Sequence, residues 1–204
     1  SRESIAIGKQ AKIDKDKSEG AIVIGRSTTN IDSAQTVTIG YDAKNNASRN
    51  SIAIGYESEN KNSNSSITIG IGGSGVLSAR GSIVIGDSAS ATEGESQIVI
   101  GDSAYISVPN SDSANNIAIG KEAVIENMDN TTLSNAIAIG AGACVQKSNA
   151  IQLGAGTIEA NYPAILQVNE FPLLDNRGKI WLDRIPSNAI GGEDNPVYGL
   201  FFRD

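Results

Sequence analysis

Four segments of this chain place reactive residue types at spacings that known sites use. The first is GIGGSG at 70–75, which fits the G-x-G-x-x-G pattern that holds a dinucleotide pyrophosphate at the start of a helix. Only seven residues separate this segment from the next predicted strand core at Ile83, so no helix of the required length fits. We therefore predict that the segment binds no cofactor.

The other three segments carry carboxylates, which are typical ligands of metal sites. Acidic residues alternate in DKDKSEG at 14–20, as in a calcium-binding loop, but Glu19 stands where the loop needs glycine. Gly25 stands where a bidentate carboxylate is needed. Asp87 and Asp102, each within GDSA, are expected in neighbouring turns as solvated carboxylates. The sequence therefore predicts no metal site.

The composition argues against an enzyme. The chain contains no histidine, so a Ser/His or Cys/His nucleophile pair is not available within it. The single cysteine, Cys144, is expected to be a small buried apolar residue. A glycan-cleaving site needs two carboxylates facing one groove, and such a site between subunits stays an alternative to which no motif points. We predict no catalytic residues.

Charge and hydropathy exclude two further classes of partner. The 16 basic and 23 acidic residues give a net charge of −7 without a basic cluster, which argues against nucleic acid. No apolar stretch approaches the roughly 18 residues that span a bilayer, so we expect no direct membrane insertion. Ser1 stands where an intact product would carry methionine, and we expect a piece of a longer or processed protein.

The chain is organised by a repeat. The pentapeptide SIAIG at 4–8 returns unchanged at 51–55 and in variant forms elsewhere, so that ten copies follow one another at steps of 14 to 20 residues. The glycines of these copies are Gly8, Gly25, Gly40, Gly55, Gly70, Gly86, Gly101, Gly120, Gly140 and Gly154. A second pattern, G-x-x-A, follows most of them, with another apolar residue two positions later.

These patterns predict two short β-strands in each repeat. In I-x-I the two large residues face the same side of a strand, and branched residues favour strands. Two short strands bury their apolar faces only when the next repeat stacks on them, about 4.8 Å away. We therefore predict an all-β fold, a parallel β-roll or β-solenoid of about ten two-strand repeats over residues 1–158.

The middle residue of I-x-I is small and mostly apolar throughout. No charged residue occurs among these positions, although a mixture with Lys, Glu and Asp is expected on a face that meets water. With the isoleucines assigned to the interior, this second face is expected to be buried against other chains. The predicted interface residues are Ala6, Val23, Thr38, Ala53, Thr68, Val84, Val99, Ala118 and Ala138.

The repeat also resembles a known family. The segment at 50–55, NSIAIG, and the segment at 135–140, NAIAIG, are similar to the head repeats of YadA-like trimeric autotransporter adhesins. The resemblance implies a left-handed roll, three copies of which pack around a threefold axis. It further implies a homotrimeric head on a bacterial surface fibre anchored in the outer membrane, which attaches to matrix or host-surface ligands, either protein or glycan.

Two insertions break the period. The longest steps follow Gly101 and Gly120, and their extra residues fall at 105–116 and 124–135. Insertions in a solenoid leave the stack as loops on one face, often the binding face. The two loops are expected in adjacent turns, where they form one patch. The candidate ligand-binding residues are Tyr105, Pro109, Asn110, Asp112, Met128, Asp129, Asn130 and Thr131.

The composition changes near the C-terminus. Residues 159–204 are rich in proline and aromatic residues, and we expect them to form a cap or connector with Trp181 as an anchor. DNRGKIWLDRIP at 175–186 resembles linker segments of bacteriophage tail fibres. An alternative function is therefore a receptor-binding domain of a virion tail fibre.

Overall fold

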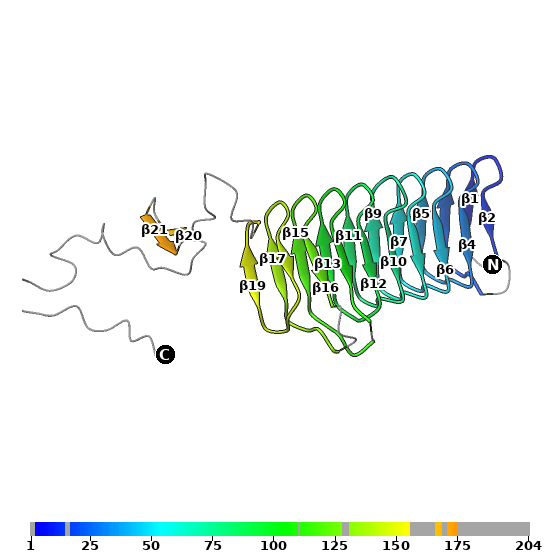
Figure 1. Cartoon of the computed structure of the whole chain (residues 1–204). Helices are drawn as coiled ribbons and strands as arrows, with labels where there is room; N and C mark the ends of the chain where they lie inside the picture. The colour runs from blue at the N-terminus through cyan, green and yellow to red at the C-terminus, as the bar shows by residue number, and fades with distance from the viewer. Residues whose placement is uncertain are drawn as a thin grey trace, which may run out of the picture. The chain divides into compact units, whose positions relative to one another are not determined.

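The computed structural model describes residues 3–14, 17–109, 111–127 and 131–155, together with the backbone of 166–168 and 171–174. The chain separates into two compact units, Ser1–Gly156 and Thr157–Asp204. Nearly all described strands belong to the first unit, a stack of turns that Figure 1 shows edge-on. No described residue lies in a helix, so none of them forms an apolar helix able to cross a membrane.

Each turn of the stack contributes one strand to each of two parallel sheets. The first sheet, here called sheet A, has ten strands in the order β1-β3-β5-β7-β9-β11-β13-β15-β17-β19. Their bounds are Ile5–Ile7, Ile22–Ile24, Val37–Ile39, Ile52–Ile54, Ile67–Ile69, Ile83–Ile85, Ile98–Ile100, Ile117–Ile119, Ile137–Ile139 and Ile151–Leu153. Every one of these strands is an I-x-I segment or its variant.

The second sheet, sheet B, comes from the segments that follow each glycine. It has nine strands in the order β18-β16-β14-β12-β10-β8-β6-β4-β2. In chain order their bounds are Lys12–Ile13, Thr29–Ile31, Lys44–Asn46, Glu59–Lys61, Gly75–Leu77, Ser90–Thr92, Tyr105–Ser107, Val124–Glu126 and Cys144–Val145. The predicted all-β parallel solenoid of about ten turns is confirmed.

The glycine that ends each sheet-A strand is required by the distance between turns. At Gly55 φ is +130°, a conformation that L side chains rarely adopt, and a Cβ there would lie 1.7 Å from the carbonyl oxygen of Gly70. The same clash with the glycine of the next turn occurs at Gly40 and Gly101. Successive turns therefore stack closely only because this corner has no side chain.

The interior lies between the two sheets and receives the middle residue of nearly every strand. In sheet A these residues include Val23, Thr38 and Ala53, each fully buried. In sheet B the row runs from asparagines at 30, 45 and 60 to apolar residues, such as Ile106 and Ile125, further along the chain. The two residues that flank each middle residue point outward.

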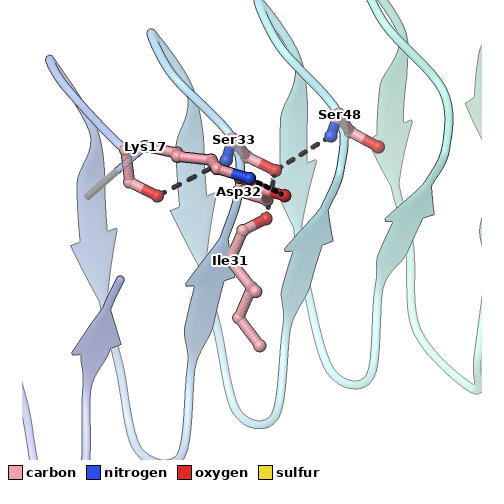
Figure 2. Close-up of polar contacts among 6 residues, drawn as sticks. Lys17, Ile31, Asp32, Ser33 and Ser48 are labelled. Atoms are coloured by element: carbon pink, nitrogen blue, oxygen red, sulfur yellow. Dashed lines mark hydrogen bonds and ion pairs between the residues drawn. The ribbon is translucent and has the colours of Figure 1, made fainter. Parts of the chain in front are cut away.

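Serine ladders satisfy the backbone at the corners where strands of sheet B end. The Ser33 hydroxyl donates to the carbonyl of Ile31 at 2.7 Å and accepts the Ser48 N–H at 2.9 Å (Figure 2). The Ser48 hydroxyl repeats this pattern with the N–H of Ser63 at 3.0 Å. Backbone groups that the corners take out of the sheets are thus paired without water. At the same corner Lys17 forms an exposed ion pair with Asp32.

In the second unit the structure describes one antiparallel pair, β20 (Leu166–Val168) with β21 (Phe171–Leu174). Trp181 and the segment at 175–186 lie outside the described residues. The cap or connector at 159–204 therefore stays a prediction.

Candidate binding surfaces

The outer face of sheet A is a continuous apolar surface, here called the isoleucine face. It consists of the first and third residues of all ten sheet-A strands, which are isoleucine except for Val37 and Leu153. Hydrogen-bonded register places them in two columns, as in Ile52↔Ile67 and Ile54↔Ile69. In mid-stack Ile69, Ile85 and Ile100 remain 36–39% exposed in the single chain.

The orientation of sheet A is therefore opposite to the one expected from the sequence, and this corrects the predicted interface. Eight of the nine predicted residues have no exposed surface within a single chain and cannot contact a second one: Val23, Thr38, Ala53, Thr68, Val84, Val99, Ala118 and Ala138. Ala6 holds the same register position in β1, where it is exposed because β1 is the first strand of the stack. The narrow space between the sheets accepts small residues from sheet A, so the isoleucines lie outside.

The two insertions lie in adjacent turns, as the sequence predicted, because β14 pairs with β16. Each insertion is anchored by an apolar residue in the interior, Val108 for the first and Leu133 for the second. The Leu133 N–H donates to the Ser113 hydroxyl at 2.9 Å, and the Asn116 side chain donates to the Leu133 carbonyl at 2.9 Å. The bases of the two loops thus form one hydrogen-bonded unit.

Among the candidate ligand-binding residues, Tyr105 is part of the strand rather than of a loop tip. It lies on the outer face of sheet B, where its hydroxyl donates to Glu126 Oε2 at 2.8 Å. The Gln146 side chain donates to the other carboxylate oxygen of Glu126 at 3.3 Å. The hydrogen bond to Glu126 raises the pKa of Tyr105 to about 12, with burial adding to the effect. Tyr105 is a neutral donor at physiological pH.

The described loop residues are exposed. Pro109, Asp112 and Thr131 all face solvent, and Thr131 accepts hydrogen bonds from the Asn127 side chain on its carbonyl and hydroxyl oxygens. Asn110, Met128, Asp129 and Asn130 lie outside the described residues. A ligand-binding role for the loops therefore stays a prediction.

The segments with possible chemistry form no catalytic arrangement in the described part of the chain. GIGGSG at 70–75 runs from the end of β9 directly into β10. Asp87 and Asp102 are solvent-exposed, and no group of three metal-ligating side chains occurs among the residues that the structure describes. The expected burial of Cys144 is wrong, because it occupies an outward position of β18. Partial desolvation, with Glu126 nearby, raises the pKa of its thiol and disfavours the reactive thiolate.

One exposed cluster was not anticipated. Tyr41 and Tyr56, which follow the repeat glycines of neighbouring turns, stack with ring centroids 5.3 Å apart and planes 7° apart. The Arg26 guanidinium lies 5.5 Å from the Tyr41 ring centroid. The signal in the sequence is that these residues are 15 positions apart, one turn of the stack. Stacking covers one face of each ring and Arg26 lies over Tyr41, so the cluster stabilises the corner, while Tyr56 remains 47% exposed.

Neither the family models nor the curated proteins searched match this sequence. Among solved structures, the collagen-binding domain of the Yersinia adhesin YadA is similar to this chain, with 15% identity and a TM-score of 0.48. The match covers 84% of this chain and 92% of that domain.

Proposed function

We propose that this chain is a non-enzymatic, homotrimeric adhesin head in which three isoleucine faces pack together. The observation that carries the proposal is the isoleucine face itself. Soluble monomers rarely expose contiguous apolar patches larger than a few hundred Å², and larger patches mark interaction sites. Because two residues of every sheet-A strand contribute, the face extends along the whole stack. A threefold arrangement gives every copy the same buried surface.

In this assembly the loops after β14 and β16 act as the ligand-binding elements. Three copies of the paired loops on one rigid rod engage repeated ligands together, so that weak single contacts add through avidity. The ligands are molecules of a host surface or extracellular matrix, and the protein is part of a fibre on a bacterial surface. The resemblance of the repeats to adhesin heads and the shared anchoring of the two loops support this assignment.

The first test is the solution molar mass, measured by size-exclusion chromatography with light scattering. The proposal expects three times the chain mass of 21.1 kDa. Replacing an outward isoleucine in mid-stack, Ile85→Asp, places three carboxylates in the apolar interface and should shift the mass toward one chain. Ile31→Asp is the matched control, because Ile31 is similarly exposed on the outer face of sheet B.

A wild-type mass near 21.1 kDa at micromolar concentration would overturn the trimer. An equal decrease in the solution molar mass of Ile85→Asp and Ile31→Asp would show that the isoleucine face has no special role in assembly. The loops are tested separately, by replacing 108–116 and 127–136 together with the short turn found at 93–97. We expect the exchanged protein to keep its mass and lose binding to cell monolayers or reconstituted matrix. Binding to bacterial envelopes instead would favour the tail-fibre function.

A further inference from the structure

A groove of about 440 Å³ crosses the outer face of sheet B, on the opposite sheet from the isoleucine face. Residues of four successive strands, β6, β8, β10 and β12, line it. Its volume falls within the range of roughly 300–1,000 Å³ that small-molecule sites occupy. The principal lining residues are Lys44, Glu59, Lys61, Gly75, Leu77 and Ser90.

The groove exists because two neighbouring outward positions carry almost no side chain. Register aligns Glu59 with Gly75 and Gly75 with Ser90. On the following strand Ser90 is aligned with Tyr105. Gly75 and Ser90 therefore leave the sheet backbone uncovered between the larger side chains of Glu59 and Tyr105. A Cβ on Gly75 would lie 2.9 Å from the carbonyl oxygen of Glu59, which places the backbone itself at the floor. The hollow is thus built by the sequence and is not a gap between loops.

The rim of the groove offers both hydrogen-bond donors and acceptors. Asp42 and Lys44 form an ion pair at 3.4 Å. The other charged residues of the rim are Glu57, Glu59 and Lys61, none of which has a salt-bridge partner among the described residues. Three carboxylates against two ammonium groups disfavour a phosphate, sulfate or other anionic ligand. Leu77 is the largest apolar side chain in the lining and is 42% exposed. One leucine offers too little apolar surface to bind a lipid chain.

We propose that this groove binds an uncharged oligosaccharide. Sugar hydroxyls both donate and accept, so they match carboxylate acceptors such as Glu59, the Lys61 donor and the hydroxyls of Ser90 and Thr92. The C–H faces of the sugar rings contact Leu77 and the bare backbone at Gly75. This assignment names a ligand class and a second binding surface, distinct from the loops. It does not depend on the trimer, because a single chain contains every lining residue.

The test is saturation-transfer NMR and titration calorimetry with maltotriose, cellotriose and N-acetylchitotriose, against sialyllactose and a heparin tetrasaccharide. Ser90→Tyr fills the groove with a residue that the neighbouring strand already carries at the aligned position. Thr29→Tyr is the matched control, because Thr29 occupies the same outward column, aligned with Lys44. We expect a neutral trisaccharide to bind wild type and the control equally, and Ser90→Tyr at least about tenfold more weakly.

A second variant, Glu59→Gln, keeps the shape of the rim and removes one charged acceptor. Binding should weaken roughly three- to tenfold, since hydrogen bonds to charged groups exceed neutral ones in strength. Unchanged binding in Ser90→Tyr would overturn the site, and preference for the acidic probes or no binding of any neutral probe would overturn the ligand class. Melting curves and light scattering on each variant separate these outcomes from misfolding and from failure of the trimer.

Discussion

The two halves of the stack fill the same narrow interior with different chemistry. From β4 to β8 the interior row of sheet B is asparagine. The side chains of Asn45 and Asn60 form hydrogen bonds with those of Thr38 and Thr68 in sheet A. From β10 onward the interior holds one apolar cluster that includes Val84, Val99 and Ile106. The backbone geometry is the same in both halves, with successive strands in unbroken parallel register. The fold therefore requires a filled and paired interior, whether polar or apolar.

The polar half is tolerated because its hydrogen bonds form a connected network. The Asn60 amide donates to Asn45 Oδ1 at 2.9 Å and to the Ile52 carbonyl at 2.8 Å, and its oxygen accepts from Thr68 at 2.8 Å. Among the described residues the single buried side-chain nitrogen or oxygen atom without a partner is Gln97 Oε1, which lies just before β13 within the apolar half. Satisfied networks stabilise a unique interior, whereas partly satisfied ones destabilise it.

The largest expected effect is common to both halves and sets the baseline for comparing them. Gly55→Ala and Gly101→Ala each introduce a Cβ that meets the carbonyl of the next glycine at about 2 Å, in addition to a positive φ. Each should lower the free energy of unfolding by roughly 3–5 kcal/mol, measured by denaturant unfolding at fixed protein concentration. Gly73→Ala is the control, because its φ is also positive but no atom lies within 4 Å. A loss at Gly73 as large as that at Gly55 would refute the close-approach argument.

The next effect tests the apolar half. Ile125 is fully buried, and Ile125→Ala removes apolar volume that the flanking turns cannot refill. The expected loss is about 3 kcal/mol in the free energy of unfolding. The matched surface change is Val124→Ala, at the neighbouring outward position of the same strand, where we expect less than about 1 kcal/mol. Similar losses at the two positions would contradict the assignment of inner and outer faces.

A smaller and more discriminating effect is expected in the polar half. Asn60→Val leaves Thr68, Asn45 and the Ile52 carbonyl each without one partner, which should cost about 2 kcal/mol. Replacing Thr38, Asn45, Asn60 and Thr68 together by valine imitates the apolar half. This fourfold variant should lose less stability than Asn60→Val alone, because the side-chain partners are removed together and only the backbone carbonyls of Val37 and Ile52 each lose one hydrogen bond. An additive loss would show that the polar interior is required for folding.

The smallest effect concerns the hydrogen bond on the outer face of the apolar half. The Tyr105 phenol is a weaker acid in the folded protein, with a pKa of about 12 against an ordinary value near 10.0. Its hydrogen bond to Glu126 is therefore fully present below about pH 10 and is lost as pH rises through about 12. Tyr105→Phe should cost less than about 1 kcal/mol at pH 7, and the difference from wild type should vanish above pH 12. In the Tyr105→Phe variant, a spectrophotometric titration should lack the phenol transition that occurs at the highest pH. A stability difference between wild type and variant that stays constant from about pH 10 to pH 12 would contradict the assignment.

Sequence reasoning located the strands well because their periodicity is local. The alternation within Ile52–Ala53–Ile54 fixes which residues share a face, and the glycine that follows fixes the corner. The G-x-x-A pattern predicted the second strand of each repeat, and Ala104 and Ile106 of one such segment are fully buried. The face of sheet A was assigned wrongly, because alternation distinguishes two faces without saying which one is inside. Assigning the larger residues to the interior fails when the space between the sheets is narrow.

By itself the sequence determined the length of each turn, the two strands per turn and the places where insertions leave the stack. These features depend on residues that are close together in the chain. Only the tertiary structure decided that the isoleucines face outward, that Asn45 bonds to Asn60 and that Gly75 and Ser90 form one groove. The first depends on the width of the space between the sheets, and the other two depend on residues 15 positions apart that stacking brings into contact. Their pairing follows from register and turn width, which no local pattern encodes.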